Sequence, residues 1–162
     1  MTSFVVDVNV PVVANGRKTH ADLKCRSACV DALEKITQTG MIVLDDERLI
    51  LSEYMNNLSM SGQPGAGDAF MKWVWENQAV TSRCEQVHLA RRNSNAADFA
   101  AFPSDPRLSS FHGDDRKYVA AALTSQRRPT VLNAVDTDWW NHRIALRQSG
   151  VSLRFLCPQH MK

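Results

Sequence analysis

The chain has 162 residues, of which 44% are hydrophobic and 22% are charged, and its formal net charge is +2. These values fit a single globular domain with one core over residues 1–162, and they exclude a disordered chain. No apolar run approaches the roughly 20 residues that span a bilayer, and Asp7 interrupts the apolar stretch near the N-terminus. We therefore expect a cytoplasmic protein that does not enter the membrane.

The four cysteines are Cys25, Cys29, Cys84 and Cys157. The first two lie four residues apart on an expected helix, and the other two are isolated in the sequence. None has the spacing of a CxxC metal motif. In a cytoplasmic protein this arrangement predicts buried, reduced thiols rather than metal ligands or disulfides.

Apolar runs alternate with amphipathic segments along the chain. The first run, "FVVDVNVPVVA" at residues 4–14, predicts a strand on which Asp7 and Asn9 point to the same side, because they are two residues apart. Further strands are expected at 41–44, 84–90, 130–135 and 151–158. Helices are expected at 20–39, 45–59, 69–78, 113–126 and 137–149, with Asp68 and the acids at 114–115 as caps and Gly40 and Gly150 as stops.

Strands that alternate with helices, and that are apolar on both faces, favour a mostly parallel sheet covered on two sides. Right-handed crossovers make this a three-layer α/β/α sandwich with about five strands. Residues 80–112 show the weakest pattern, and "RRNSNAADFAAFPSDPRLSS" predicts a loop with a turn or two of helix. The fold class is thus an α/β sandwich in a single domain.

Acidic residues fall where strands end or helices begin. Asp7 lies in the first strand, Asp136 and Asp138 follow "VLNAV", and Asp114 and Asp115 open a helix. Glu53 is a polar residue among apolar neighbours in "LILSEYMNNL". Ligands of parallel sheets gather beyond the carboxyl ends of the strands. Several carboxylates gathered there repel one another unless a cation neutralises them, and oxygen donors suit Mg²⁺ or Mn²⁺.

Four segments resemble the motifs of the PIN-domain nuclease family, whose toxin members include VapC-like ribonucleases. "VVDVNVPVVA" is similar to the first motif, "LSEYMNNL" to the second, "DDRKYVAAAL" to the third and "NAVDTDWW" to the fourth. Together they run from residue 5 to about residue 156. Two features depart from the family pattern: the double acid at 114–115, and an Arg-rich insertion at about 83–110. The three alanines of the third motif align Asp115 rather than Asp114 with the family acid.

The resemblance implies a metal-dependent hydrolase of phosphodiester bonds, most often in RNA, and in many bacterial members a toxin. It implies a PIN-like fold, Mg²⁺ or Mn²⁺ as the cofactor and Asn9 as a residue that orients ligands or water. It also implies an RNA substrate, single-stranded or tRNA-like, with an antitoxin or a second copy of the chain as further partners. The catalytic and metal-binding residues would be Asp7, Glu53, Asp115 and Asp136, with Asp138 and Asp114 as further metal ligands.

The chain has 17 acidic residues, and 11 remain when these six acids are set aside. The same chain has 19 Lys and Arg residues. Such an excess of positive charge suits a protein that binds a phosphate backbone. The candidate nucleic-acid contacts are Arg91, Arg92, Arg116, Lys117, Arg127 and Arg128. For any single one of them an ordinary solvated charge is the simpler explanation.

Other functions remain open from the sequence. One is an inactive PIN-like module that binds nucleic acid without metal. Another is a nuclease specific for a DNA structure. A phosphatase with an aspartyl nucleophile is disfavoured, because such enzymes need a second aspartate two residues on, where this chain has Asn9. The acids themselves can also be caps or buried carboxylates satisfied by backbone donors.

Overall fold

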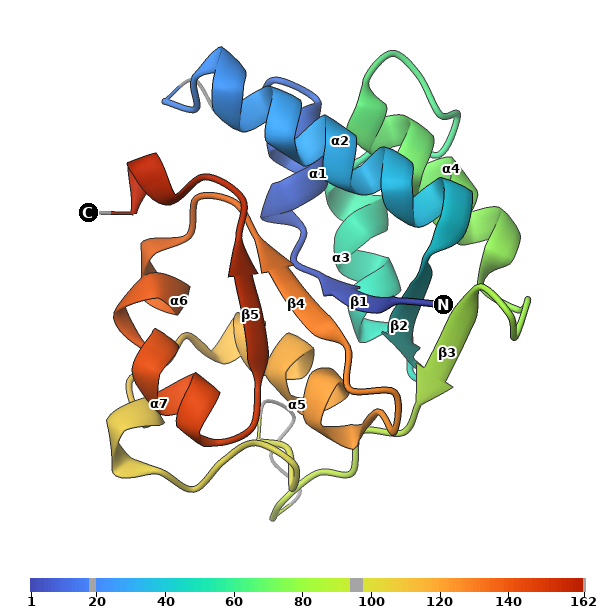
Figure 1. The fold of residues 1–162 in the computed structure, drawn as a ribbon. Helices are drawn as coiled ribbons and strands as arrows, with labels where there is room; N and C mark the ends of the chain where they lie inside the picture. The colour runs from blue at the N-terminus through green and yellow to red at the C-terminus, as the bar shows by residue number, and fades with distance from the viewer. Residues whose placement is uncertain (18–19, 94–97, 162) are drawn as a thin grey trace.

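The computed structural model describes residues 1–17, 20–93 and 98–161, and its centre is a five-stranded parallel sheet in the order β3-β2-β1-β4-β5 (Figure 1). The strands are β1 (Ser3–Val6), β2 (Met41–Asp45), β3 (Cys84–Val87), β4 (Thr130–Asn133) and β5 (Ser152–Phe155). Helices cover both faces of this sheet. The predicted three-layer α/β/α fold is confirmed.

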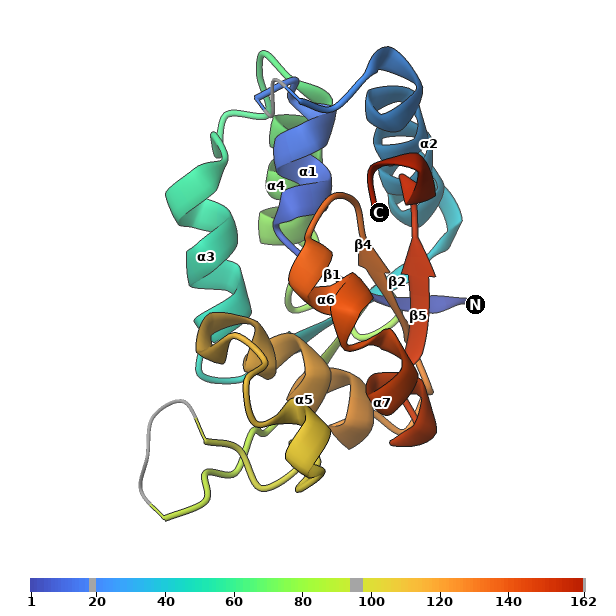
Figure 2. The same cartoon turned by 90° about the vertical axis from the view of Figure 1, so that its left-hand side faces the viewer.

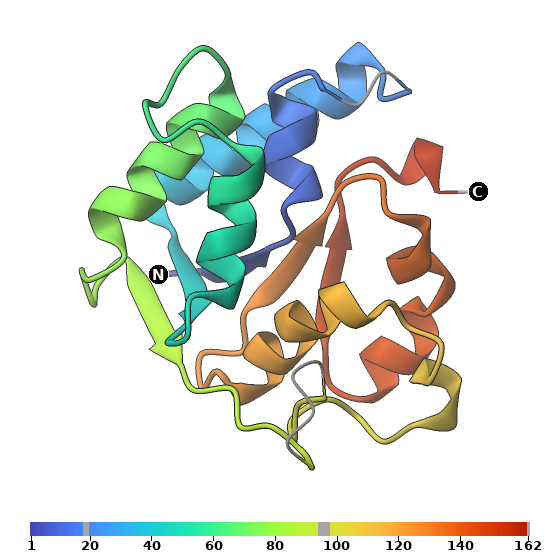
Figure 3. The ribbon, with the colours of Figure 1, turned by 180° about the vertical axis from the view of Figure 1, so that it is seen from behind.

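Seven α-helices connect the strands in the described part of the chain. They are α1 (Asn9–Ala14), α2 (Leu23–Thr39), α3 (Leu49–Asn57), α4 (Ala66–Asn77), α5 (Arg116–Thr124), α6 (Thr137–Asn141) and α7 (Arg143–Gln148). Helices α1, α2 and α4 pack together, while α5 packs on β1, β2 and β4, and α7 packs on β5 (Figures 2 and 3). None of the helices within the described residues is long and apolar enough to cross a membrane.

The three inner strands carry the core. Every residue of β2 is buried, as are Val5 and Val6 of β1 and Val131 and Leu132 of β4. Apolar runs without alternation are expected for strands that are covered on both faces. By contrast, the edge strand β5 alternates between exposed and half-buried residues. The edge therefore shows the alternating pattern of a half-buried strand, whereas the centre shows the pattern of a fully buried one.

The first apolar run is not one long strand, as the sequence predicted. Strand β1 ends at Val6, and helix α1 begins at Asn9. The Asp7 carboxylate accepts a hydrogen bond from the Asn9 backbone N–H at 3.0 Å, which turns the chain between the two elements. Pro11 lies in the first turn of α1. Backbone N–H groups there have no acceptor within the helix, so a proline costs no hydrogen bond. Asp7 and Asn9 therefore do not lie on one face of a strand.

The segment expected to form one helix at 137–149 contains two. Helix α6 ends at Asn141 and α7 begins at Arg143, with His142 between them in a non-helical conformation. The His142 ring nitrogen Nδ1 lies 2.8 Å from the Asp138 carbonyl oxygen, which also accepts the His142 backbone N–H at 3.1 Å. The turn fixes His142 beside Asp138, which belongs to the site described below.

The prediction of four reduced thiols was wrong for two of them. Cys25, near the start of α2, forms a disulfide with Cys157, which follows β5 and lies 132 residues away. Cys29 and Cys84 are free and buried, and burial raises the pKa of each thiol to about 12. Disulfides are typical of oxidising compartments, so the cysteines no longer support the predicted cytoplasmic location, which stays a prediction.

Candidate metal centre

Three carboxylates from distant parts of the sequence meet at the carboxyl ends of β1 and β4. Asp7 directly follows β1, Asp136 follows β4 at the N-cap of α6, and Asp115 immediately precedes α5. One oxygen from each lies within 4.8 Å of the others. Asp7 is buried, whereas Asp115 and Asp136 are half-buried. These are three of the four predicted catalytic acids.

Asn133, the last residue of β4, ties the acids of the two strands together. Its side-chain Nδ2 donates to Asp7 Oδ2 at 3.2 Å, and its Oδ1 accepts the Asp136 backbone N–H at 3.1 Å. Asn9 makes a second link, because its Oδ1 accepts the Ala134 backbone N–H at 2.8 Å. Each amide side chain therefore connects the segment after β1 with the segment after β4.

Glu53, the fourth predicted acid, reaches the pocket from α3. The Tyr118 hydroxyl of α5 donates to Glu53 Oε1, and Lys117 Nζ lies 3.3 Å from the same oxygen. Helix α3 is itself held by Asp45, whose buried carboxylate accepts the backbone N–H groups of Leu49 and Ile50 at 2.9 and 2.8 Å. The structure thus places Glu53 at the edge of the site, where its carboxylate already pairs with the ammonium group of Lys117.

Asp114 and Asp138 line the same open pocket, which has a volume of about 510 Å³. Its other lining residues are Glu53, Ser110, His112, Asp115 and Asp136. Asp114 is exposed and is not a member of the three-carboxylate cluster, whereas Asp115 is. The structure therefore brings Asp115, the acid favoured by the motif alignment, into the centre.

Asp138 is held by neighbours that the sequence did not reveal. Its Oδ2 accepts the His112 backbone N–H at 2.9 Å, and its Oδ1 lies 3.2 Å from His142 Nδ1. The other ring nitrogen of His142 lies 3.1 Å from Ser110 Oγ. Asp138 also donates its own backbone N–H to Asp136 Oδ1 at 2.9 Å. Asp138 is consequently a residue that fixes Asp136 and the loop at 110–112.

The crowding of negative charge changes the acidity of two members of the cluster. Burial is the main reason that the pKa of Asp7 is raised well above its ordinary value, and the charge of Asp115 adds to it. Burial, together with the charge of Asp136 nearby, raises the pKa of Asp115 to about 7. Among the described residues no Lys or Arg forms an ion pair with Asp7, Asp115 or Asp136. The negative charge of the cluster is therefore not balanced by an ion pair with any described Lys or Arg.

The donor set fits a hard divalent cation. The cluster offers only carboxylate oxygens, which are the preferred ligands of Mg²⁺ and Mn²⁺, and no sulfur that would select a softer metal. Asn9 also leaves its buried side-chain Nδ2 without a partner among the residues that the structure describes. This donor needs an oxygen acceptor, such as water or a substrate atom. The chemistry of the residues agrees with the cation predicted from the sequence.

Most of the predicted nucleic-acid contacts have partners inside the molecule. Arg91 lies 2.6 Å from Glu47, Arg127 lies 4.0 Å from Glu85, and Lys117 pairs with Glu53 as described above. Arg128 is exposed at a positive φ of 51° in the turn before β4. Contact of any of these side chains with a nucleic acid stays a prediction.

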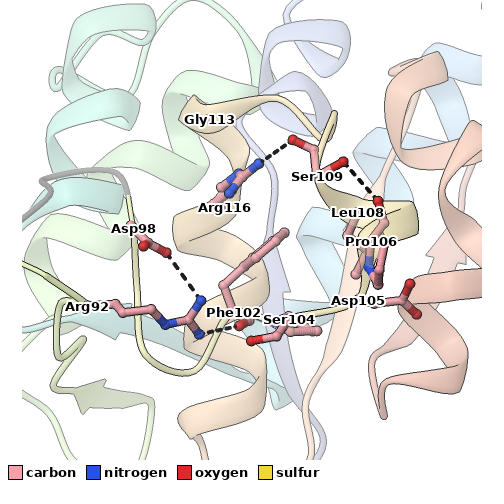
Figure 4. Close-up of a pocket in the computed structure, with 11 residues that line it drawn as sticks. Arg92, Asp98, Phe102, Ser104, Asp105, Pro106, Leu108, Ser109, Gly113 and Arg116 are labelled. Carbon is pink, nitrogen blue, oxygen red and sulfur yellow. Dashed lines mark hydrogen bonds and ion pairs between the residues drawn. The ribbon is translucent and has the colours of Figure 1, made fainter.

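Two of the predicted arginines hold the loop before α5. Figure 4 shows Arg92 paired with Asp98 and bonded to the Phe102 carbonyl oxygen, and Arg116 bonded to the Ser109 carbonyl oxygen. The Arg116 guanidinium also stacks 4.6 Å from the centre of the Phe102 ring. These guanidinium groups give the Arg-rich insertion a structural role, since they fasten it beside Asp115.

No protein-family model, curated protein or solved structure matches this chain, so its place in the PIN-domain family stays a prediction.

Proposed function

We propose that this protein is a Mg²⁺- or Mn²⁺-dependent nuclease that hydrolyses phosphodiester bonds of RNA. The observation that carries the proposal is the cluster of Asp7, Asp115 and Asp136, whose oxygens lie within 4.8 Å of one another with no Lys or Arg paired to them in the described chain. Three such carboxylates are costly to hold together without a cation. The order and spacing of the PIN-like motifs support the same chemistry.

A cation bound there would polarise a phosphoryl oxygen and lower the pKa of a coordinated water. The residues of this chain would hold and orient the reactants. Asp7, Asp115 and Asp136 would bind the cation, with Glu53 at the edge of the pocket. The Nδ2 of Asn9, which has no partner among the described residues, would donate to an oxygen of water or substrate. Asn133 and Asp138 would keep the carboxylates in place through the hydrogen bonds described above.

The choice of RNA rests on the motif resemblance, which also supports a role as the toxin of a toxin–antitoxin or defence system. On that proposal an antitoxin protein would be a partner of this chain. A homodimer stays a prediction from the same resemblance.

The proposal is tested by incubating a mixed RNA pool with wild type and Asp7→Asn, each with Mg²⁺, with Mn²⁺ and with excess chelator. Asp31→Asn is the matched control, because Asp31 is an exposed aspartate on α2 outside the pocket. We expect cleavage by wild type and Asp31→Asn with either cation, and loss of at least 100-fold in rate for Asp7→Asn, about 3 kcal/mol of transition-state stabilisation.

Cleavage that persists in chelator, or in Asp7→Asn, contradicts the proposal. Cleavage of a DNA pool but not of RNA would retain the metal chemistry and reject the substrate. Salt-sensitive RNA binding without cleavage, unchanged by metal or by Asp115→Asn, would show instead an inactive nucleic-acid-binding module.

A further inference from the structure

A second group of metal-ligand side chains lies where the C-terminal segment meets α2. Cys25 and Cys29 are one turn apart on α2, and Cys157 follows β5; all three side chains are fully buried. One sulfur from each lies within 4.8 Å of the others. Figures 1 and 2 show the C-terminal turn beside the first turns of α2. This thiol cluster shares no residue with the acidic centre.

The His160 imidazole lies at the same turn of α2 as Cys25, outside the group of three sulfurs. His160 is three residues after Cys157, and its backbone N–H bonds to the Cys157 carbonyl oxygen at 3.0 Å. Its ring Nε2 lies 3.4 Å from Asp22 Oδ1, and the same Asp22 oxygen accepts the Cys25 backbone N–H at 2.7 Å. The imidazole therefore lies at the turn of α2 that carries Cys25. A carboxylate beside an imidazole is also the usual partner of a metal-binding histidine.

The disulfide accounts for Cys25 and Cys157 but not for the third sulfur. A cross-link needs two cysteines, and Cys29 on its own would be an ordinary buried apolar residue. Its position one turn from Cys25, with its sulfur close to both bonded sulfurs, completes a set of three thiols, toward which the His160 imidazole would have to turn to add a nitrogen ligand. Such sets bind Zn²⁺ tetrahedrally at structural sites. Their sulfurs select a softer metal than the carboxylates of the acidic centre do.

We propose that, when the disulfide is reduced, Cys25, Cys29 and Cys157 bind a thiophilic divalent cation such as Zn²⁺, with His160 as the fourth ligand. A dithiol reductant would supply the two electrons that cleave the Cys25–Cys157 bond, becoming a disulfide itself and leaving two thiols on the protein. The cation would then displace the protons of three thiols into solvent. The C-terminal turn would thus stay attached to α2 in both redox states, by a disulfide or by a metal.

The test uses the full chain, unfolded and reduced with a dithiol and then refolded without oxygen in the presence of Co²⁺, which reports sulfur ligands through its thiolate charge-transfer absorption. The Asp7→Asn background removes a predicted ligand of the acidic centre, and the absorption band itself reports thiolates only. We expect one thiolate-bound cobalt per chain, displaced by Zn²⁺, and no such band for the oxidised protein.

Two serine variants separate the site from the other thiols. Cys29→Ser removes one of the three thiolates, so it should weaken the band and the binding of cobalt, while the Cys25–Cys157 disulfide still forms on oxidation. Cys84→Ser, which changes the other free buried cysteine, should keep the band. His160→Ala should weaken cobalt binding at least 10-fold.

A measurement on the unmodified chain keeps the proposal testable if Cys29→Ser does not fold. Bound Zn²⁺ should protect the cysteines at 25, 29 and 157 from alkylation, and chelator should restore their reaction, with Cys84 reacting equally in both cases. The proposal is rejected if the reduced chain shows no thiolate–cobalt band, if Cys29→Ser keeps the band at full intensity, or if Zn²⁺ leaves the alkylation of these three cysteines unchanged.

Discussion

Asp115 is a carboxylic acid held next to other acids, and its charge costs stability when no cation is present. Because its pKa rises from 3.8 to about 7 on folding, this cost develops as the pH rises from about 4 to about 7 and is fully present at higher pH. Asn at this position carries no charge. We expect Asp115→Asn to raise the free energy of unfolding by about 1–3 kcal/mol at pH 8 in chelator, and by much less at pH 4.

Urea denaturation of both proteins at the two pH values measures this difference. Asp31→Asn, which changes an exposed aspartate of α2, controls for the loss of a single charge. An Asp115→Asn protein that is less stable than wild type at pH 8, or equally stabilised at both pH values, would show that the cluster is not under electrostatic strain.

The acids of the cluster could be selected from the sequence because Asp115 and Asp136 fall at a predicted helix start and a predicted strand end, and because the four motif-like segments contain all three acids. The residues that position them could not. The pattern of "TVLNAV" predicts only a strand around Asn133, although an amide at the end of a buried strand is a signal for a polar contact. Tyr118 and Lys117 reach Glu53 from another helix, and that pairing depends on how α3 and α5 pack.

At the scale of the element, α3 depends on one buried carboxylate at its start. Asp45 accepts the backbone N–H groups of Leu49 and Ile50, which have no partner of their own within the helix. We expect Asp45→Ala to lower the free energy of unfolding by about 1–3 kcal/mol and to reduce cleavage, because α3 carries Glu53. The neighbouring Asp46→Ala is the matched control.

Asp46 is exposed, and its one ion pair among the described residues is with the exposed His88 at 3.1 Å, so its loss should change stability by less than about 0.5 kcal/mol. Thermal denaturation of the two variants gives the comparison directly. If Asp46→Ala is as destabilised as Asp45→Ala, the cap does not hold α3.

The elements that sequence pattern missed are short and depend on local side-chain bonds. The apolar run of β1 continues through Val12, Val13 and Ala14. No change in hydrophobic periodicity marks where the strand ends and helix α1 begins. The hydrogen bond from the Asn9 N–H to the Asp7 carboxylate ends the strand. Burial of every residue of α1 stabilises the helix that follows. At the break between α6 and α7 the His142 side chain likewise makes a local contact, with the Asp138 carbonyl oxygen.

For the molecule as a whole, the disulfide closes a loop across nearly the entire chain. Cys25 and Cys157 are 132 residues apart, so their bond restricts the unfolded chain strongly. We expect reduction in metal-free buffer to lower the free energy of unfolding by about 2–5 kcal/mol. Urea denaturation with and without a dithiol measures the effect, and Cys157→Ser should show no further response to the dithiol. An equal midpoint for both redox states would contradict this account.

The overall fold was predictable because alternation of apolar strands with amphipathic helices restricts the topology to few solutions. The cysteine pairing was not, since it requires knowing that the segment after β5 returns to the start of α2. Spacing along the sequence carries no such information for two residues this far apart.

The most direct test of the acidic centre is the binding of Mn²⁺, followed by the loss of the electron paramagnetic resonance signal of free Mn²⁺ as protein is added. Wild type and Asp31→Asn should bind the ion with equal affinity, and Asp7→Asn should bind it at least 10-fold more weakly. Equal binding by all three proteins, or no binding by wild type, would show that Asp7, Asp115 and Asp136 do not form a metal centre.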